Sequence, residues 1–314
     1  MQLEHKYIYM VYQEGSISKA AEKLFITQPA LSIAIQRVEN SLGLPIFDRS
    51  QRPITLTPAG RAYIHMIKET QYLEEEFQQQ LYDMQELNTG KITIGGSHYL
   101  NAYILPKCLA GFTNKYPNIV IELEEHGSSV IAEMLSEHKV DLTFNCDPHL
   151  VKEYENYPAF RDTVLLAIPE GHLINCGKEK LGLSAQDVLE GKHLLSTCPT
   201  VNLSAFRDLS YVLLSQGNNL YERSMQLFKE AGFEPKVKLS ISQLVTAYHL
   251  AENGFAAAFV SDRLVTSAET KLKFYKLDSD VIQRQFYILL PKRKYTSLAT
   301  RKFIEYFMYG RVNG

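Results

Sequence analysis

Cysteine is scarce in this chain of 314 residues, and its four cysteines stand far apart. Successive members of the set Cys108, Cys146, Cys176 and Cys198 are separated by 22 to 38 positions. Zinc sites and dithiol redox sites need closely spaced pairs instead. We therefore expect free thiols in a reducing compartment, although a disulfide between Cys176 and Cys198 remains open. The histidines include no HExxH or other close pair, so no metal site is predicted.

Long apolar runs and catalytic motifs are also missing. No run approaches about 18 consecutive apolar residues, the length that spans a membrane. The N-terminus MQLEHKYIYM lacks the apolar stretch of a signal peptide, so we expect a cytoplasmic protein without a membrane partner. No Ser/His/Asp elbow or P-loop occurs, and Gly95 and Gly96 lack the third glycine of a dinucleotide site. The sequence thus predicts no cofactor and no enzyme activity.

Neither sign of charge dominates the chain. Hydrophobic residues make up 45% and charged residues 22%, which is ordinary for a folded protein of roughly two domains. Residues 1–60 hold six Lys or Arg against five Asp or Glu, whereas residues 61–90 hold two against six. The acidic excess is therefore confined to one segment.

That segment belongs to a predicted long helix over residues 58–88. Thr57 suits the N-cap, Pro58 suits the first turn, and Asn88 to Gly90 suit a left-handed end. A helix of about 30 residues spans roughly 45 Å, so it should connect two bodies. One apolar stripe repeats every three or four residues and should pair with another chain; its members are Ala59, Tyr63, Met66, Thr70, Leu73, Phe77, Leu81, Met84 and Leu87.

Residues 1–60 predict three short helices. The first ends at Gly15, Ser18 is placed to cap the second, and Thr27 is placed to cap the third. On the third helix an apolar stripe consists of Leu31, Ile35, Val38 and Leu42. Polar side chains that can hydrogen-bond to base edges lie on another face of this helix, at Gln28, Ser32 and Gln36. This arrangement predicts a helix-turn-helix.

Two short strands, PIFDRS and PITLTP, are predicted to form a wing around Gln51 and Arg52. Arg49 and Arg52 would then lie beside a phosphate backbone. With about three phosphate contacts, one protomer would bind DNA poorly, so binding requires at least a dimer. A plain three-helix bundle with a solvated polar face is the alternative.

The run GSISKAAEKLFITQPALSIAIQRVENSLGLPIFDRS, followed by LTPAGR, resembles the winged helix-turn-helix of LysR-type transcriptional regulators. The resemblance implies an all-α winged helix-turn-helix domain over 1–60, a linker helix for dimerisation over 61–90, and an effector domain over 91–314. That effector domain would have an α/β fold like that of periplasmic binding proteins. Its subdomain I would cover about 91–162 plus 267–314, and its subdomain II about 163–266.

The resemblance also implies partners and contacts. We expect a homotetramer on double-stranded DNA, assembled as a dimer of dimers, with a small-molecule effector and RNA polymerase as further candidate partners. Ile33 occupies a position where the family commonly has Arg or another polar residue, so it would favour thymine methyl groups. Gln36 stands where Arg or Lys is frequent. The expected DNA-contacting residues are Ser18, Thr27, Gln28, Pro29, Ser32, Ile33, Gln36, Arg37, Arg49 and Arg52.

After Gly90, strands alternate with helices, which predicts two parallel α/β units with a cleft between them. Strands are expected at 91–96, 118–126, 140–146, 162–169, 193–197, 236–242 and 255–261. Helices are expected at 102–116, 128–138, 218–232 and 243–254.

Serines at strand-to-helix junctions indicate what the cleft binds. Ser97 and the pair Ser128 and Ser129 each precede a helix, and free amides at a helix N-terminus suit a small anion such as a carboxylate. Plain helix capping is the alternative. The expected effector-binding residues are Ser97, His98, Tyr99, Ser128, Ser129, Asn145, Thr197, Thr200 and Asn202.

These patterns together predict a sequence-specific DNA-binding transcriptional regulator whose activity depends on a small anionic effector. The alternative is a small-molecule-binding protein or enzyme whose N-terminal helices serve only for assembly.

Overall fold

A computed structural model describes residues 3–50, 52–84, 89–292 and 295–310. The chain divides into two compact units, Met1–Gln85 and Glu86–Gly314, which are described separately below. Among the described helices, none has both the length and the apolar character needed to cross a membrane.

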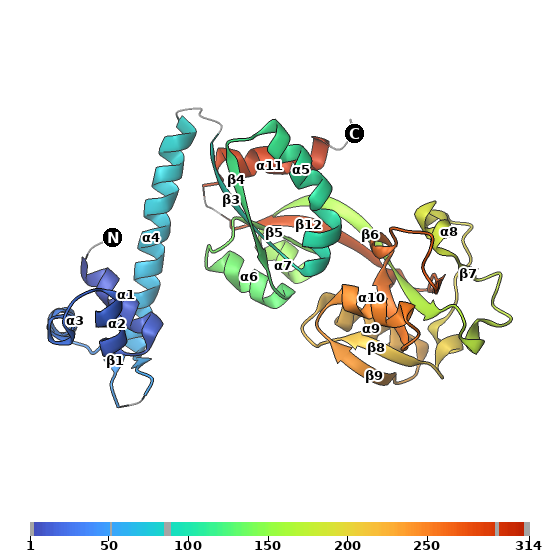
Figure 1. Ribbon diagram of the computed structural model, residues 1–314, viewed down its shortest axis with the longest axis horizontal. Coiled ribbons are helices and arrows are strands. Elements are labelled where there is room, and N and C mark those ends of the chain that lie inside the picture. Colours follow the sequence, from blue (N-terminus) through green and yellow to red (C-terminus); the bar gives the residue numbers. More distant parts are fainter. Residues whose placement is uncertain (1–2, 51, 85–88, 293–294, 311–314) are drawn as a thin grey trace. The chain divides into compact units, whose positions relative to one another are not determined.

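The N-terminal unit is a small helical bundle with a two-stranded wing (Figure 1). Strands β1 (Phe47–Asp48) and β2 (Thr55–Leu56) pair antiparallel, as expected for the wing. The helices are α1 (Leu3–Glu14), α2 (Ile17–Lys23), α3 (Gln28–Leu42) and α4 (Pro58–Met84). Their apolar core includes Ile8, Val11, Ala20, Ala21, Leu31, Ile35, Ile46, Phe47, Ile64 and Ile67.

The predicted N-cap of α3 is confirmed, whereas that of α2 is not. Thr27 caps α3 as predicted, because its side chain accepts a hydrogen bond from the amide of Ala30. The prediction that Ser18 caps α2 is wrong. Ser16 is the N-cap, with the extended backbone that this position requires, and it accepts from the amide of Lys19. Ser18 lies exposed within the first turn.

Helix α4 packs on the N-terminal core at its start. Ile64 and Ile67, which lie outside the predicted stripe, are buried there. Gly60 lets the helix approach the wing closely, because a Cβ at this position would lie 2.0 Å from the carbonyl oxygen of Ile46. The amide of Gly60 donates to the hydroxyl of Thr57, the predicted cap. The predicted end at Asn88 lies outside the described residues.

The C-terminal unit contains a ten-stranded sheet with the order β4-β3-β5-β12-β6-β10-β8-β9, and β11 and β7 lie off this path. The sheet is mixed, whereas the sequence predicted parallel strands. In subdomain I, β3 pairs in parallel with β4 and β5; in subdomain II, β8 pairs in parallel with β9 and β10. Two antiparallel neighbours, β6 and β12, run between the subdomains. The bounds are β3 (Gly90–Gly96), β4 (Ile119–Glu125), β5 (Leu142–Asn145), β6 (Glu155–Pro169), β7 (Gly182–Leu183), β8 (Ser210–Leu214), β9 (Lys236–Ile241), β10 (Ala257–Ser261), β11 (Leu272–Tyr275) and β12 (Gln283–Leu290).

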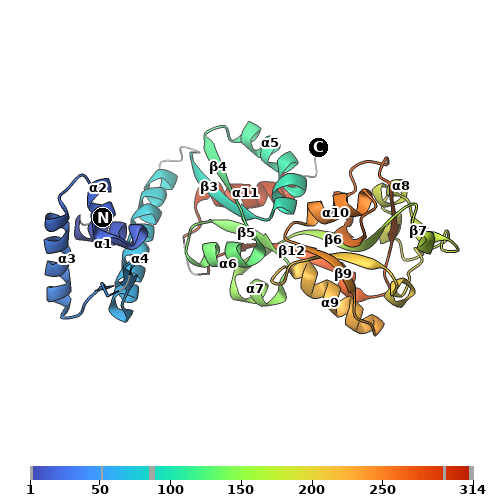
Figure 2. The same cartoon turned by 60° about the horizontal axis from the view of Figure 1, so that its bottom comes forward.

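Helices cover both faces of the sheet. In subdomain I, α5 (Pro106–Lys115) lies on one side, and α6 (Ser128–Ser136) and α7 (Pro148–Glu153) lie on the other (Figure 2). Helix α11 (Leu298–Tyr309) packs against α5, with the ring of Phe303 edge-on to Phe112 at 5.3 Å. In subdomain II, α9 (Asn219–Ala231) and α10 (Leu244–Glu252) lie on opposite sides of the strands, and α8 (Ala185–Leu189) lies near β11.

One predicted strand is wrong. Residues 193–197 form no strand; they begin in a 3₁₀ turn, Lys192–Leu194, after Gly191 in the left-handed region. The amides of Leu194 and Leu195 donate to carbonyls of that turn, so they are not free for a strand ladder. The strand of this region is β8, which the sequence patterns did not predict.

The structure also changes two boundaries. The helix expected at 102–116 is preceded by a π-helical turn, η1 (Leu100–Ile104), and α5 starts only at Pro106. The return to subdomain I was expected near residue 267. However, β11 still pairs with β6 and β7 in subdomain II, and the chain crosses back in β12.

Candidate DNA-contacting helix and ligand cavity

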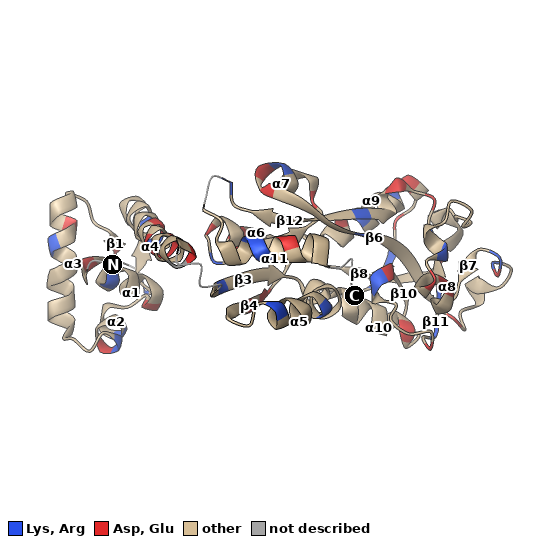
Figure 3. Ribbon diagram, turned by 90° about the horizontal axis from the view of Figure 1, so that it is seen from above, with Lys and Arg blue, Asp and Glu red and all other residues tan. Residues whose placement is uncertain are grey.

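Helix α3 presents a polar face because its apolar side is fixed in the core. Leu31 and Ile35 are fully buried, whereas Leu42 of the predicted stripe is exposed. Around this anchored side, Ser32 is half-buried, and the other expected contact residues of the helix, Gln28, Pro29, Ile33, Gln36 and Arg37, are exposed. The charged side chains of α3 are Arg37 and Glu39, so most of the helix surface is neutral (Figure 3).

Glu39 joins the end of α3 to the wing. Its Oε1 accepts hydrogen bonds from the amides of Ile46 at 2.8 Å and Phe47 at 3.2 Å. Its Oε2 accepts from Nη2 of Arg49 at 2.8 Å. Arg49, an expected phosphate contact, is therefore held beside α3. Arg52 is exposed in the wing.

A second candidate site is a cavity of about 50 Å³ between the subdomains, here called the central cavity. It lies at the carboxyl ends of β3, β5, β8 and β9, where open parallel sheets bind ligands. The N-terminal ends of α6, α9 and α10 contribute Ser128, Asn219 and Leu244 to its lining. Three helix N-termini thus supply partial positive charge to one small space.

Several residues expected to bind the effector meet in this cavity. Ser97, Tyr99, Ser128 and Asn145 line it. Oδ1 of Asn145 accepts from the amide of Asp147 at 2.9 Å, which leaves its amide group to donate. These four residues come from three strand-to-helix junctions of subdomain I.

Five expected residues do not line the cavity. The Nδ1 atom of His98 lies 3.2 Å from Oε1 of Glu125, and Ser129 is exposed on α6. Thr197 and Thr200 are exposed, and Asn202 instead caps a 3₁₀ turn. The last three lie at or just after residues 193–197, which do not form the strand that would have carried them to the cleft.

The residues of subdomain II that do line the cavity follow β8 and β9. Asn218 and Asn219 were missed because β8 was not recognised. Ser242 and Gln243 follow β9, which was predicted, and the same junction rule applied there would have found them. Asn218 caps α9 by accepting from the amide of Leu220. Lining residues that were not predicted from the sequence include Cys146, Asn218, Asn219, Ser242, Gln243 and Arg284.

A buried ionic network forms the floor of the cavity. Nε of Arg284 on β12 donates to Asp162 on β6 at 2.7 Å, and Nη2 donates to the other carboxylate oxygen. The hydroxyls of Tyr99 and Ser261 donate to the same carboxylate, each at 2.8 Å. Burial opposes the charged form of Arg284, but the carboxylate of Asp162 more than offsets this and raises the pKa of Arg284 above its ordinary value.

Cys146 and Asn219 connect the two halves of the cavity wall. The thiol of Cys146 donates to Oδ1 of Asn219 at 3.1 Å, and Nε of Arg223 donates to the same oxygen at 2.9 Å. Burial raises the pKa of the Cys146 thiol to about 11, so the thiol stays protonated at neutral pH. Asn219 therefore directs its amide group, and not its oxygen, toward other partners.

Within the described ranges, no group of three or more His, Cys, Asp or Glu side chains is placed to hold a metal ion. The described lining of the central cavity also contains no carboxylate side chain. Its polar side-chain groups are hydroxyls, amides, the thiol of Cys146 and one guanidinium that is already paired with Asp162. Such a lining donates hydrogen bonds and suits a ligand with negative charge.

Comparison with known proteins identifies both units. Residues 4–61 match the family described as bacterial regulatory helix-turn-helix protein, lysR family, and residues 85–309 match the family described as LysR substrate binding domain. The chain is 27% identical over 305 residues to the "Uncharacterized HTH-type transcriptional regulator YcgK" of Bacillus subtilis (strain 168). That alignment covers 96% of this chain and 91% of the relative.

Solved structures show the same fold. Full-length CbnR complexed with its target DNA has a TM-score of 0.67 at 20% identity, with 98% of this chain and 99% of that chain covered. The regulatory domain of Synechocystis PCC6803 CcmR in complex with 2-PG has a TM-score of 0.60 at 17% identity, with 72% of this chain and 99% of that chain covered. Since the two family matches together extend over nearly the whole chain, the protein belongs to the LysR family and is a LysR-type transcriptional regulator.

Proposed function

We propose that this regulator reads its operator through the exposed face of α3 and responds to a small anion in the central cavity. Gln28, Ser32 and Gln36 supply hydrogen-bonding groups for base edges, and Ile33 supplies methyl groups for thymine. Thr27, Arg49 and Arg52 are placed at the cap and wing, where phosphate contacts belong. Pro29, Arg37 and Ser18 complete the proposed contact surface.

The observation that carries the effector class is the lining of the central cavity. Three helix N-termini, Ser97, Ser128 and the amide of Asn145 converge on it, without a described carboxylate in the lining. Such donors favour a carboxylate or phosphate group. The structural neighbour CcmR, solved in complex with 2-PG, gives a precedent for a ligand held by this fold.

We further propose that the protein works in the cytoplasm as a dimer, or as a dimer of dimers, joined through α4. An effector that prefers one orientation of the two subdomains would shift the population of protein arrangements and so change DNA engagement. RNA polymerase is a candidate partner when the operator lies near a promoter.

The DNA-reading assignment can be tested on operators recovered from genomic fragments by the purified full-length protein. Replacing both Gln28→Ala and Ser32→Ala should remove discrimination between operator and unrelated DNA, because each base contact that reads sequence contributes about 1–3 kcal/mol. Circular dichroism and oligomer mass should stay unchanged, since both side chains are outside the core.

Asn40→Ala is the matched control, because Asn40 is polar, exposed and on the same helix but near its other end. Its operator discrimination should equal that of the wild type. If the double variant still prefers the operator as strongly as the wild type does, the sequence is read by other residues and the assignment to α3 fails.

A further inference from the structure

The central cavity is small, and the described side chains that line it leave no charge unbalanced. Its volume of about 50 Å³ has room for about four water molecules, so it suits a ligand of a few heavy atoms. The guanidinium of Arg284 forms a bidentate pair with Asp162, and the thiol of Cys146 stays protonated at neutral pH. Selection among small acids therefore depends on which lining groups donate hydrogen bonds and which accept them.

Three asparagines line the cavity, and each has its side-chain oxygen occupied by a donor of the same chain. Oδ1 of Asn145 accepts from the amide of Asp147 at 2.9 Å. Oδ1 of Asn218 accepts from the amide of Leu220 at 2.9 Å. Asn145 is only 6% exposed, so its remaining amide group is a donor held inside the cavity wall.

The third asparagine is fixed in the same sense. Oδ1 of Asn219 accepts from Nε of Arg223 at 2.9 Å and from the thiol of Cys146 at 3.1 Å. Backbone amides and an arginine Nε can only donate, so these partners decide which way each asparagine side chain is turned. The Nδ2 groups of the three asparagines have no hydrogen-bond partner in the described part of the chain. The three side chains therefore offer a ligand N–H donors and no free oxygen.

Acceptors for a ligand are scarce in the same lining. It contains no carboxylate side chain among the described residues. The hydroxyls of Ser97 and Ser128 can donate as readily as they can accept. The side chain of Gln243 is exposed, so water can satisfy its oxygen. A ligand group that must donate several hydrogen bonds would find few partners here.

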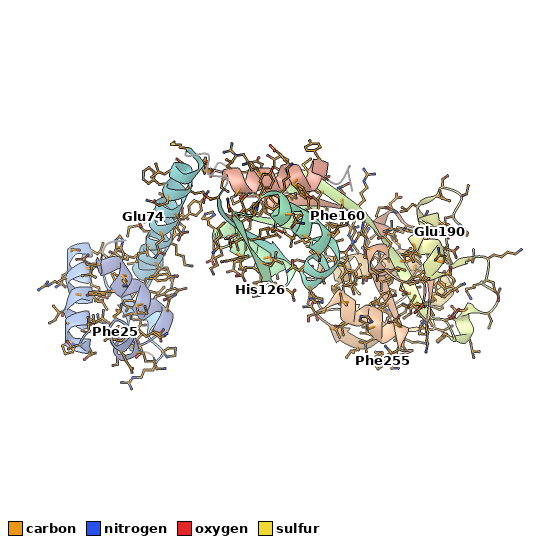
Figure 4. The ribbon with its side chains drawn as sticks, turned by 45° about the horizontal axis from the view of Figure 1, so that its top comes forward. Phe25, Glu74, His126, Phe160, Glu190 and Phe255 are labelled. Carbon is orange, nitrogen blue, oxygen red and sulfur yellow. The ribbon has the colours of Figure 1, made fainter. Side chains whose placement is uncertain are left out.

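Carboxylates near the cavity do not supply the missing acceptors. Glu124 and Glu125 end strand β4, beside the end of β3, but they do not line the cavity. Oε1 of Glu125 lies 3.2 Å from Nδ1 of His98. Oε2 of Glu124 lies 3.5 Å from Nε2 of His126, which is labelled in Figure 4. Both carboxylates thus lie beside histidines outside the cavity.

We propose that the central cavity selects a small 2-oxo acid over the corresponding amino acid, an inference that rests on the proposed effector site. The carboxylate and the adjacent carbonyl oxygen of a 2-oxo acid only accept hydrogen bonds, which matches the three asparagine amides. A 2-ammonium group instead brings three donors and a positive charge. Three helix N-termini already supply partial positive charge to this space, so the ammonium group would be repelled and left without partners.

Isothermal titration calorimetry on the full-length protein, with pyruvate, alanine and propionate as probes, tests this selection. Pyruvate should bind saturably at one molecule per chain, with a dissociation constant below about 1 mM. Alanine has nearly the same size but carries an ammonium group in place of the carbonyl, and propionate lacks the carbonyl oxygen. Each of these two should bind about tenfold more weakly or worse, because polar groups are left unpaired in the complex.

Replacing Asn218→Asp changes one amide donor of the cavity into a carboxylate oxygen. The cap of α9 is kept, because Asp caps a helix as well as Asn does. This variant should bind pyruvate about tenfold more weakly or worse and should lose the preference for pyruvate over alanine. Asn202→Asp is the matched control, since Asn202 also caps by accepting from the amide of Ser204 but does not line the cavity. Its affinities should equal those of the wild type.

The outcomes separate this selection from the anion site itself. If the wild type binds alanine or propionate as tightly as pyruvate, the selection is overturned while the proposed anion site stands. The same holds if the Asn218→Asp variant keeps both affinities of the wild type. If none of the three acids binds, the anion site fails, and the selection fails with it.

Discussion

Asp162 is fully removed from solvent and accepts four hydrogen bonds from three side chains. Two of these bonds come from Arg284, whose side chain is 4% exposed. The other two come from Tyr99 in subdomain I and from Ser261 in subdomain II. A carboxylate held by both subdomains and by the strand between them fixes how these parts meet.

Replacing Asp162→Asn should lower stability strongly, because it leaves the buried guanidinium of Arg284 without a counter-charge. The expected loss is about 3–5 kcal/mol in the free energy of unfolding, which differential scanning calorimetry would register as a lower melting temperature. The double variant Asp162→Asn with Arg284→Met removes the buried charge and should recover part of the loss. A single variant that melts at the same temperature as the wild type would contradict this role of Asp162.

Single residues differ in how far sequence could predict them. Ser97 and Ser128 follow predicted strands and Asn145 ends one, and these junctions place all three in the central cavity. Arg284 offered no such signal, because its partner Asp162 is 122 positions away and lies on a different strand. Short-range patterns predict which side of an element a residue occupies, but not which distant residue it meets.

At the scale of the elements, α4 carries an apolar surface that the described part of the chain leaves uncovered. Beyond the turns that pack on the N-terminal core, Leu73 is 61% and Phe77 is 56% exposed, and Leu81 and Met84 are exposed on the same helix. Apolar side chains at such spacing are costly in water and favour pairing with a second helix. From Leu73 onward, the predicted stripe therefore coincides with the exposed apolar surface of α4. The first turns of α4 pack against the N-terminal core of the same chain.

Replacing both Leu73→Glu and Phe77→Glu should convert the oligomer into monomers, since four charges would face one another across a helix pair. Size-exclusion chromatography with light scattering would show the loss of mass. Glu75→Gln, an exposed change on the same helix, should leave the mass as in the wild type. An unchanged mass for the double variant would exclude α4 as the dimer contact.

The element-level predictions failed where local hydrogen bonds replaced a strand ladder. Residues 193–197 were predicted to form a strand, yet His193 is buried and its Nε2 lies 2.9 Å from Oδ2 of Asp262. Leu194 and Leu195 on the same segment are 61% and 55% exposed. Tertiary contacts therefore determine the structure of residues 193–197. Because a strand was predicted there, the strand β8 further along the chain was not predicted.

Considered as a whole, the protein has little net positive charge for a DNA-binding molecule. Its formal charge is -2, and residues 1–60 carry six cations. Two of these cations are paired inside the chain: Lys23 with Glu14 at 2.6 Å and Arg49 with Glu39 at 2.8 Å. One protomer can therefore neutralise only a few phosphates, so tight binding would depend on the assembly proposed above. The sequence indicated this charge limit, but the number of chains in the assembly depends on contacts between chains.

Operator affinity should consequently fall steeply with ionic strength. If two or more protomers contribute about three phosphate contacts each, a plot of log affinity against log salt should have a slope of magnitude about 6 or more. Fluorescence anisotropy with a labelled operator, over a series of salt concentrations, measures this slope. A slope near 3 would show that one protomer accounts for the phosphate contacts.

The fifteen-residue strand β6 limits how this protein can be recombined. Its first half pairs with β12 and its second half with β10 and β11, so a single strand belongs to both subdomains. A chimera in which one subdomain came from a relative would have to cut this strand and replace half of its pairing partners. Exchange of the whole unit from residue 86 onward breaks no pairing among the described strands, which makes that junction the natural point for transplanting ligand response from one regulator to another.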